Sequence, residues 1–145
     1  MPFRFNMQKV LDYREQREEE AKVRLAVTQR RLEETRQRLA ALQTELEEAE
    51  INLRESVFKE AAERWLREVY VKGLRGDVAA AAVQMRMQMQ LVEEARKLTA
   101  ACAIDKKIME KLKWRKRQRY IHDEKMKEQH ANDEAATLRY NAPSF

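Results

Sequence analysis

The residues of this chain that could do chemistry are few, and their spacing does not build a reaction centre. His122 and His130 lie eight positions apart among acidic residues. A di-metal helical bundle needs repeated Glu-x-x-His units on facing helices, and this sequence has none. It also lacks a glycine-rich phosphate loop and a Cys-x-x-Cys pair. We therefore expect solvated histidines, and predict that the protein is not an enzyme and holds no metal or cofactor.

Cys102 is the only cysteine, which excludes an intramolecular disulfide and removes any need for an oxidising compartment. Its small side chain is expected to pack between helices. The first residues lack the apolar run of a signal peptide, and no stretch of roughly 18 uncharged apolar residues could cross a membrane. These features predict a cytoplasmic protein without membrane insertion.

A basic run is the strongest candidate for a binding site. The segment from Asp105 to Arg119 has two acidic residues against eight basic ones, which are Lys106, Lys107, Lys111, Lys113, Arg115, Lys116, Arg117 and Arg119. Trp114 and Tyr120 flank its most basic part. Such a run can bind nucleic acid or an acidic protein surface, or it can be a solvated helix face. The net charge of only +5 argues against a dedicated DNA-binding region.

A second candidate surface is apolar. Positions two apart on a helix face about 200° away from each other, so Met87 points away from Met85 and Met89. Methionine adapts to varied partners. Together with the nearby Trp65, Tyr70 and Leu74, Met87 could form a recognition patch. Alternatively, these residues form a small satellite core.

Long helices must position these side chains, because leucines recur at seven-residue intervals, at Leu25, Leu32, Leu39, Leu46 and Leu53. Three positions after the first four of them come Thr28, Thr35, Leu42 and Ala49. A strict seven-residue repeat keeps one narrow stripe facing a partner helix. The stripe predicts a coiled coil rather than a globular core.

The partner helix is predicted to be the second half of the same chain. Both glycines, Gly73 and Gly76, lie close together, where a turn costs little. We expect one domain, a long antiparallel two-helix hairpin. Its first helix spans about 6–53, a short irregular helical segment spans about 54–76, and its second helix spans about 77–140. Two chains in a parallel coiled coil fit the glycines less well.

The returning helix has a weaker stripe. Leu91, Leu98, Leu112 and Met126 lie on one heptad line, which Asp105 and Arg119 interrupt. A second line contains Ala95, Cys102 and Met109. Small residues on that line would let the leucines of the first helix approach closely.

Two blocks of sequence, one in each half of the chain, have the pattern of a known family. The opening block is Phe3-Arg4-Phe5-x3-Lys9-Val10-Leu11-x2-Arg14, followed by Glu18, Ala21 and Leu25-Ala26. The closing block is Leu112-Lys113, the basic stretch to Tyr120, and Glu128-Gln129-x3-Asp133-Glu134-x-Ala136. Both blocks resemble the flagellar export protein FliJ family, and the resemblance extends over nearly the whole chain.

This resemblance implies a non-enzymatic stalk and adaptor of the flagellar type III export apparatus. Such proteins insert the end that carries both termini into the hexameric export ATPase, promote its assembly, and connect it to the membrane export gate and to export chaperones. We expect a monomer when free, located in the cytoplasm at the inner-membrane apparatus, with no nucleic acid partner. The alternatives are the stalk of a virulence-type injection system, a nucleic-acid-binding hairpin and a helical-hairpin chaperone.

Two sets of residues follow as candidate contacts. The expected ATPase-binding residues are Phe3, Phe5, Val10, Tyr13, Lys116, Arg117, Arg119 and Tyr120. The expected gate-binding residues are Trp65, Tyr70, Leu74 and Met87.

Overall fold

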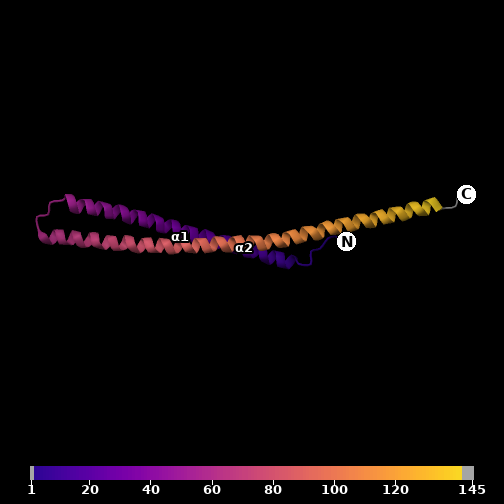
Figure 1. Ribbon diagram of the computed structural model, residues 1–145, viewed down its shortest axis with the longest axis horizontal. Coiled ribbons are helices and arrows are strands. Elements are labelled where there is room, and N and C mark those ends of the chain that lie inside the picture. The colour runs from indigo at the N-terminus through magenta and orange to yellow at the C-terminus, as the bar shows by residue number, and fades with distance from the viewer. Residues whose placement is uncertain (1, 142–145) are drawn as a thin grey trace. The chain divides into compact units, whose positions relative to one another are not determined.

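The computed structural model describes residues 2–141, which form two α-helices and no strand (Figure 1). Helix α1 is Gln8–Glu55, 48 residues long, and α2 is Ala61–Asn141, 81 residues long. The predicted all-α hairpin of two long helices is confirmed.

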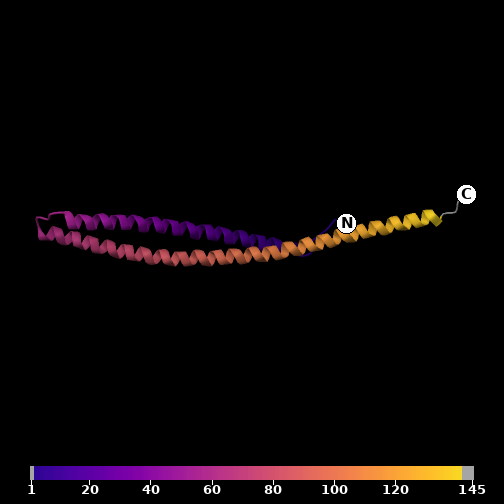
Figure 2. The same ribbon diagram turned by 45° about the horizontal axis from the view of Figure 1, so that its top comes forward.

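The chain divides into two compact units, and each unit contains one segment of α1 and one segment of α2. Unit 1 contains residues 1–18 and 101–145, of which 2–18 and 101–141 are described, and unit 2 contains residues 19–100. Within unit 2, α1 and α2 lie side by side and antiparallel in both ribbon views (Figures 1 and 2). Two side-chain bonds link the helices there, from the Tyr70 hydroxyl to Glu45 Oε1 at 2.6 Å and from Arg75 Nε to Glu50 Oε1 at 3.1 Å.

The contact between the inner faces of α1 and α2 is called here the seam. The leucine stripe of α1 is its inner face. Its buried or half-buried positions alternate by three and four residues and are Leu11, Arg14, Glu18, Ala21, Leu25, Thr28, Leu32, Thr35, Leu39, Leu42, Leu46, Ala49 and Leu53. The predicted stripe therefore continues toward the N-terminus through Arg14 and Glu18. The seam hydroxyls of Thr28 and Thr35 donate to carbonyl oxygens of Leu25 and Arg31, so these polar groups are satisfied within their own helix.

The inner face of α2 uses the residues that directly follow one of the two predicted heptad lines, so that Val92 and Thr99 are inside in place of Leu91 and Leu98. Its buried or half-buried positions are Val71, Leu74, Val78, Ala81, Met85, Gln88, Val92, Ala95, Thr99, Cys102, Lys106, Met109, Lys113, Lys116 and Tyr120. The line through Ala95, Cys102 and Met109 is correct. The line through Leu91 and Leu98 is wrong, because these leucines are 51% and 37% exposed. The prediction assumed that the leucines of α2 face inward, whereas the inward positions are Val92, Thr99 and Lys106.

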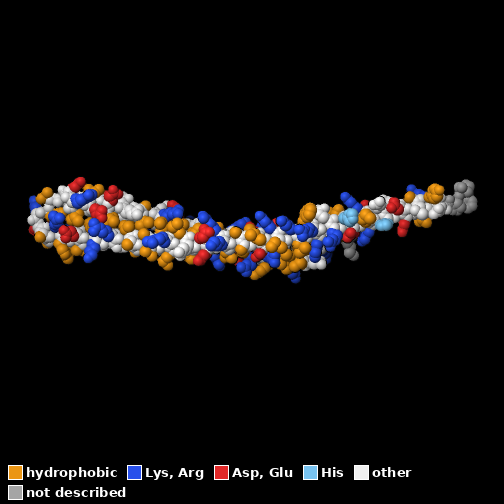
Figure 3. All heavy atoms as spheres, in the orientation of Figure 1, with side chains coloured by type: hydrophobic (Ala, Val, Ile, Leu, Met, Phe, Trp, Pro, Cys, Tyr) orange, Lys and Arg blue, Asp and Glu red, His pale blue; other side chains and the backbone are white. Residues whose placement is uncertain are grey.

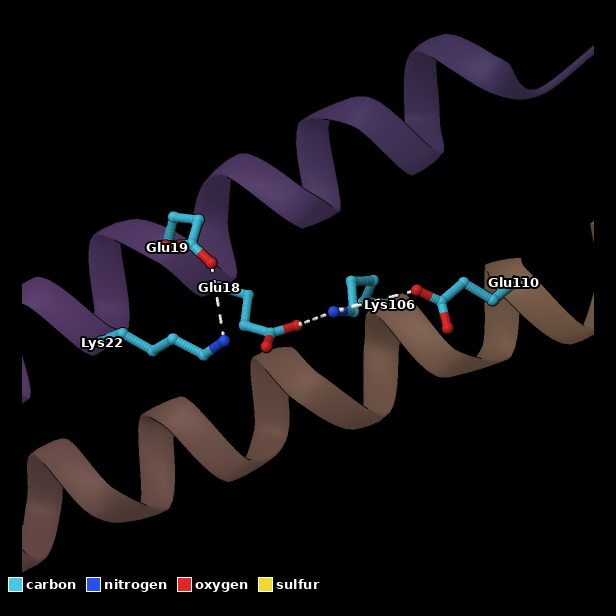
Figure 4. Close-up of polar contacts among 5 residues, drawn as sticks. All are labelled: Glu18, Glu19, Lys22, Lys106 and Glu110. Carbon is cyan, nitrogen blue, oxygen red and sulfur yellow. Dashed lines mark hydrogen bonds and ion pairs between the residues drawn. The ribbon is translucent and has the colours of Figure 1, made fainter.

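A buried ion pair occupies the seam of unit 1. Glu18 of α1 points toward α2, where its Oε2 lies 2.9 Å from Lys106 Nζ (Figure 4). The Glu18 side chain is only 6% exposed, and Lys106 also lies 3.8 Å from Glu110. One turn earlier, Arg14 donates across the seam to the Asp105 carbonyl oxygen at 2.8 Å. Because a buried charge is tolerated only opposite its partner, this polar layer opposes sliding of one helix along the other.

The bend lies at residues 56–60, and the prediction of a turn at the glycines is wrong. Gly73 and Gly76 are interior residues of α2 with no positive φ, and an added Cβ at either would meet nothing within 4 Å. The expected irregular helical segment is instead regular helix from Ala61 onward, and Asp77 does not begin a helix. Exposed glycines cost a helix about 1 kcal/mol each, which this long helix tolerates.

Replacing these glycines therefore tests the position of the bend. We expect Gly73→Ala and Gly76→Ala each to stabilise the protein by about 1 kcal/mol, because helix propensity rises and nothing clashes. The control Ala80→Gly, at another exposed position of α2, should destabilise by a similar amount. Urea unfolding followed by circular dichroism measures all three. Destabilisation by both alanine variants would place a turn at the glycines.

The seam ion pair is tested by a double-mutant cycle. We expect Glu18→Ala and Lys106→Ala to show a coupling energy of about 1–2 kcal/mol in unfolding experiments, because each single change removes the nearest opposite charge of a seam residue. The same cycle on the exposed Arg64–Glu68 pair, whose side chains are 61% and 50% exposed, should give about 0.3–0.5 kcal/mol. Equal coupling in the two cycles would contradict a special role for the seam pair.

Candidate protein-binding surfaces

Unit 1 contains an apolar cluster that joins the start of the chain to α2. Phe5, Leu11 and Met109 are 7%, 3% and 3% exposed, and Phe3 and Leu112 pack against them. The Phe5 carbonyl accepts a hydrogen bond from the Gln8 amide at 3.1 Å, which begins α1. The residues before the helix are thus fixed on α2 by a buried aromatic ring.

Cations and aromatic rings surround this cluster. The Lys116 ammonium lies 5.8 Å from the centre of the Phe5 ring, a cation–π distance. The rings of Phe3 and Tyr120 are 5.7 Å apart and inclined by 46°. They border a shallow hollow, called here the terminal hollow, which is lined by Pro2, Phe3, Arg4, Lys116, Arg119, Tyr120 and Asp123. An aromatic hollow with three cations and one carboxylate suits an apolar or acidic protein segment.

The structure brings together only part of the predicted ATPase-binding set. Phe3, Lys116, Arg119 and Tyr120 line the terminal hollow, and Phe5 belongs to the buried cluster against which Phe3 packs. The remaining three residues do not line the hollow: Val10, Tyr13 and Arg117.

Tyr13 is 58% exposed on α1, where Arg17 donates to its hydroxyl at 3.4 Å and lies 6.0 Å from its ring centre. Sequence reasoning left three lining residues, Pro2, Arg4 and Asp123, out of the set. The opening block itself contained the signal for Arg4, which lies between the two phenylalanines. Asp123 is one turn after Tyr120 and had no distinguishing signal.

A second exposed apolar surface lies on unit 2, directly after the bend. Trp65, Leu66, Val69 and Tyr70 are 61%, 61%, 47% and 47% exposed, and we call them the bend patch. Leu66 and Val69 were missing from the prediction. The sequence contained a signal for both, because Val69 lies one turn after Trp65 and Leu66 lies one turn before Tyr70.

Two predicted residues of this second set do not belong to the bend patch. Leu74 is only 5% exposed and packs in the seam, so its placement on a surface is wrong. Met87 is 61% exposed, but it lies 22 residues after Trp65, about 33 Å along a helix. The Tyr70 hydroxyl is already engaged, because it donates a hydrogen bond to Glu45. This bond, together with desolvation, raises the pKa of Tyr70 above its usual value. Tyr70 therefore offers its ring rather than its hydroxyl.

Other kinds of site have little support within residues 2–141. No three His, Cys, Asp or Glu side chains there gather closely enough to hold a metal ion. Across the same residues, neither helix includes a segment apolar and long enough to traverse a bilayer.

The sequence comparison decides the family. A family model described as the flagellar FliJ protein matches residues 3–144. The chain belongs to the FliJ family. This membership confirms the resemblance of the two end blocks and makes the chain a component of the flagellar export apparatus. Searches of curated proteins and of solved structures returned no match.

Removing the buried ring tests how this FliJ family member holds its first residues. We expect Phe5→Ala to cost about 3 kcal/mol locally, because a buried aromatic side chain leaves a cavity. Hydrogen exchange and proteolysis at residues 2–11 should accelerate strongly. The control Val10→Ala, at a position that is 36% exposed, should change stability by less than about 0.5 kcal/mol. Unchanged exchange in the Phe5 variant would contradict anchoring by this ring.

Proposed function

We propose that the protein is a non-enzymatic stalk and adaptor, whose unit 1 inserts into the hexameric ATPase of the flagellar export apparatus and promotes ring assembly. The observation that carries the proposal is the terminal hollow. Two half-buried aromatic rings and three cations gather there, from the first residues of the chain and from the second half of α2. Aromatic and Arg side chains are the types that dominate protein–protein binding energy.

The continuation of α2 supports the same role. From Ile121 to Asn141 every side chain of the helix is exposed, although the backbone stays helical. A bare helix of this length gains little from propensity alone, since most helical stability in proteins comes from packing. A surrounding protein would supply that packing. The proposed ATPase contacts are therefore the terminal hollow and this bare helix, with Val10, Tyr13 and Arg117 at their border.

Contact with the membrane export gate and with export chaperones is assigned to the bend patch. Trp65, Leu66 and Val69 offer a large apolar surface, and exposed apolar patches on small proteins commonly mark binding sites. Met87 lies too far along α2 to share one small partner site with them. In this proposal the protein is a monomer when free and works in the cytoplasm, at the inner face of the export apparatus.

The proposal predicts that reversing three charges in unit 1 strongly reduces ATPase stimulation. The variant carries Lys116→Glu, Arg117→Glu and Arg119→Glu, because single charge changes on a surface have small effects. We expect the variant to remain folded and to lose most of its stimulation of ATP hydrolysis by the purified export ATPase. A malachite-green phosphate assay measures the rate.

The matched control reverses the same number of charges on unit 2, at Arg67, Lys72 and Arg86, which are all exposed. The control should stimulate hydrolysis normally. Normal stimulation by the unit 1 variant would show that the electrostatic assignment is wrong. Equal loss in both variants would attribute the effect to net charge.

The flagellar assignment is separable from a virulence-type stalk. Family membership favours the flagellar system. Deletion of the protein should therefore abolish swimming and leave any injection system of the same cell active.

A further inference from the structure

One strongly basic surface of unit 1 is not used by the terminal hollow. In heptad notation the seam positions of α2 are a and d, with Lys106 at a and Met109 at d, and positions b, c and f point away from the partner helix. The outward residues along this stretch are Ile104, Lys107, Ile108, Lys111, Trp114 and Arg115, and all six are exposed. We call them the outer face. On the side shown in Figure 3, Lys and Arg side chains lie among apolar ones over this part of the molecule, before the first histidine.

The outer face combines large apolar groups with charge of one sign. Ile104, Ile108 and Trp114 are 58%, 54% and 62% exposed. Lys107, Lys111 and Arg115 follow one another at four-residue spacing, about 6 Å along the helix. The acidic residues Asp105 and Glu110 occupy other helix positions, and Glu110 lies next to Lys106. Among residues 2–141, no ion pair involves any of the three outer cations.

These side chains discriminate between kinds of partner. Nucleic acid would pair with the cations and could stack on Trp114, but its phosphates gain nothing from two exposed isoleucines. Anionic lipid satisfies both halves of the surface, because headgroups pair with Lys and Arg while Ile and Trp enter the boundary with the acyl chains. Trp in particular favours the membrane interface. Ile108, Lys111 and Arg115 also border a small hollow with Leu112.

We propose that the outer face of unit 1 binds anionic lipid surfaces, with this part of α2 lying in the plane of the interface. No span across the bilayer is involved. The proposal is independent of the ATPase contact, because seam positions Lys116 and Tyr120 contribute to the terminal hollow while the outer face uses positions b, c and f. A free stalk would thereby be held at the membrane surface before it meets a protein partner.

The test is binding of the purified full chain to vesicles of phosphatidylglycerol and phosphatidylcholine in equal parts, compared with phosphatidylcholine alone. We expect cosedimentation only with the anionic vesicles, and loss of binding as salt is raised to about 0.5 M, because screening weakens surface charge interactions. In a Trp65→Phe background the only remaining indole is Trp114. Its fluorescence should shift to the blue and be quenched by brominated lipid.

Two variants test the two halves of the surface. Reversal of Lys107, Lys111 and Arg115 to Glu should weaken partitioning by about 100-fold or more, since each cation near an anionic surface contributes about fivefold. Its control is the charge-matched variant at Arg67, Lys72 and Arg86, which should keep most of the binding. Ile104→Gln with Ile108→Gln should weaken binding by at least about tenfold. The control is Val23→Gln with Val83→Gln, at two exposed positions of unit 2 outside the bend patch, which should keep most of the binding.

Three results would overturn the proposal. The first is absence of binding to anionic vesicles at low salt. The second is binding that the charge variant retains or that the isoleucine variant leaves unchanged. The third is salt-sensitive binding to a single-stranded oligonucleotide, or to an acidic helical peptide, in the absence of vesicle binding. No ATPase is present in these experiments, so their failure leaves the ATPase proposal standing, and failure of ATPase stimulation leaves the lipid result standing.

Discussion

The seam between α1 and α2 is the constraint on which the remaining structure depends. In each unit, one side chain in every three or four residues turns inward, and the buried residues of the fold come almost entirely from these positions. A stripe this narrow leaves most of the helix circumference exposed. Side chains outside the seam are consequently available for partners, and aromatic residues such as Trp65 and Trp114 contribute little to the core.

Charge within the seam adds specificity to the apolar packing. A stripe of leucines and small residues tolerates displacement by one heptad, because one apolar layer resembles the next. The pairing of Glu18 with Lys106 does not tolerate it, since displacement would bury two separated charges. The same register brings Phe5 onto Met109 and Phe3 onto Tyr120. The terminal hollow therefore depends on a polar layer about three helical turns away.

The sequence predicted the helices better than their junction. Leucine repeats identify α1 because one of the two heptad lines on its inner face is leucine at every position from Leu11 to Leu53 except Glu18. The inner line of α2 mixes Val92, Thr99 and Lys106, which composition does not distinguish from a surface line. The prediction placed the bend wrongly because glycine lowers helix stability without always ending a helix. Gly73 and Gly76 lie at positions of α2 where a side chain would contact nothing, so their lack of one removes no packing. Of the predicted ATPase-binding residues, Phe3, Lys116, Arg119 and Tyr120 lie together in the structure. Leu74, which was predicted to bind the export gate, is instead buried in the seam.

Side-chain footprinting of the native chain bound to the purified export ATPase tests the central claim most directly. Hydroxyl radicals modify aromatic side chains that solvent reaches. The half-buried Phe3 and Tyr120 report on the terminal hollow, and the exposed Trp65 reports on the bend patch. The account predicts strong protection of Phe3 and Tyr120 and unchanged reactivity of Trp65. Protection of Trp65 with unchanged reactivity at Phe3 and Tyr120 would contradict it.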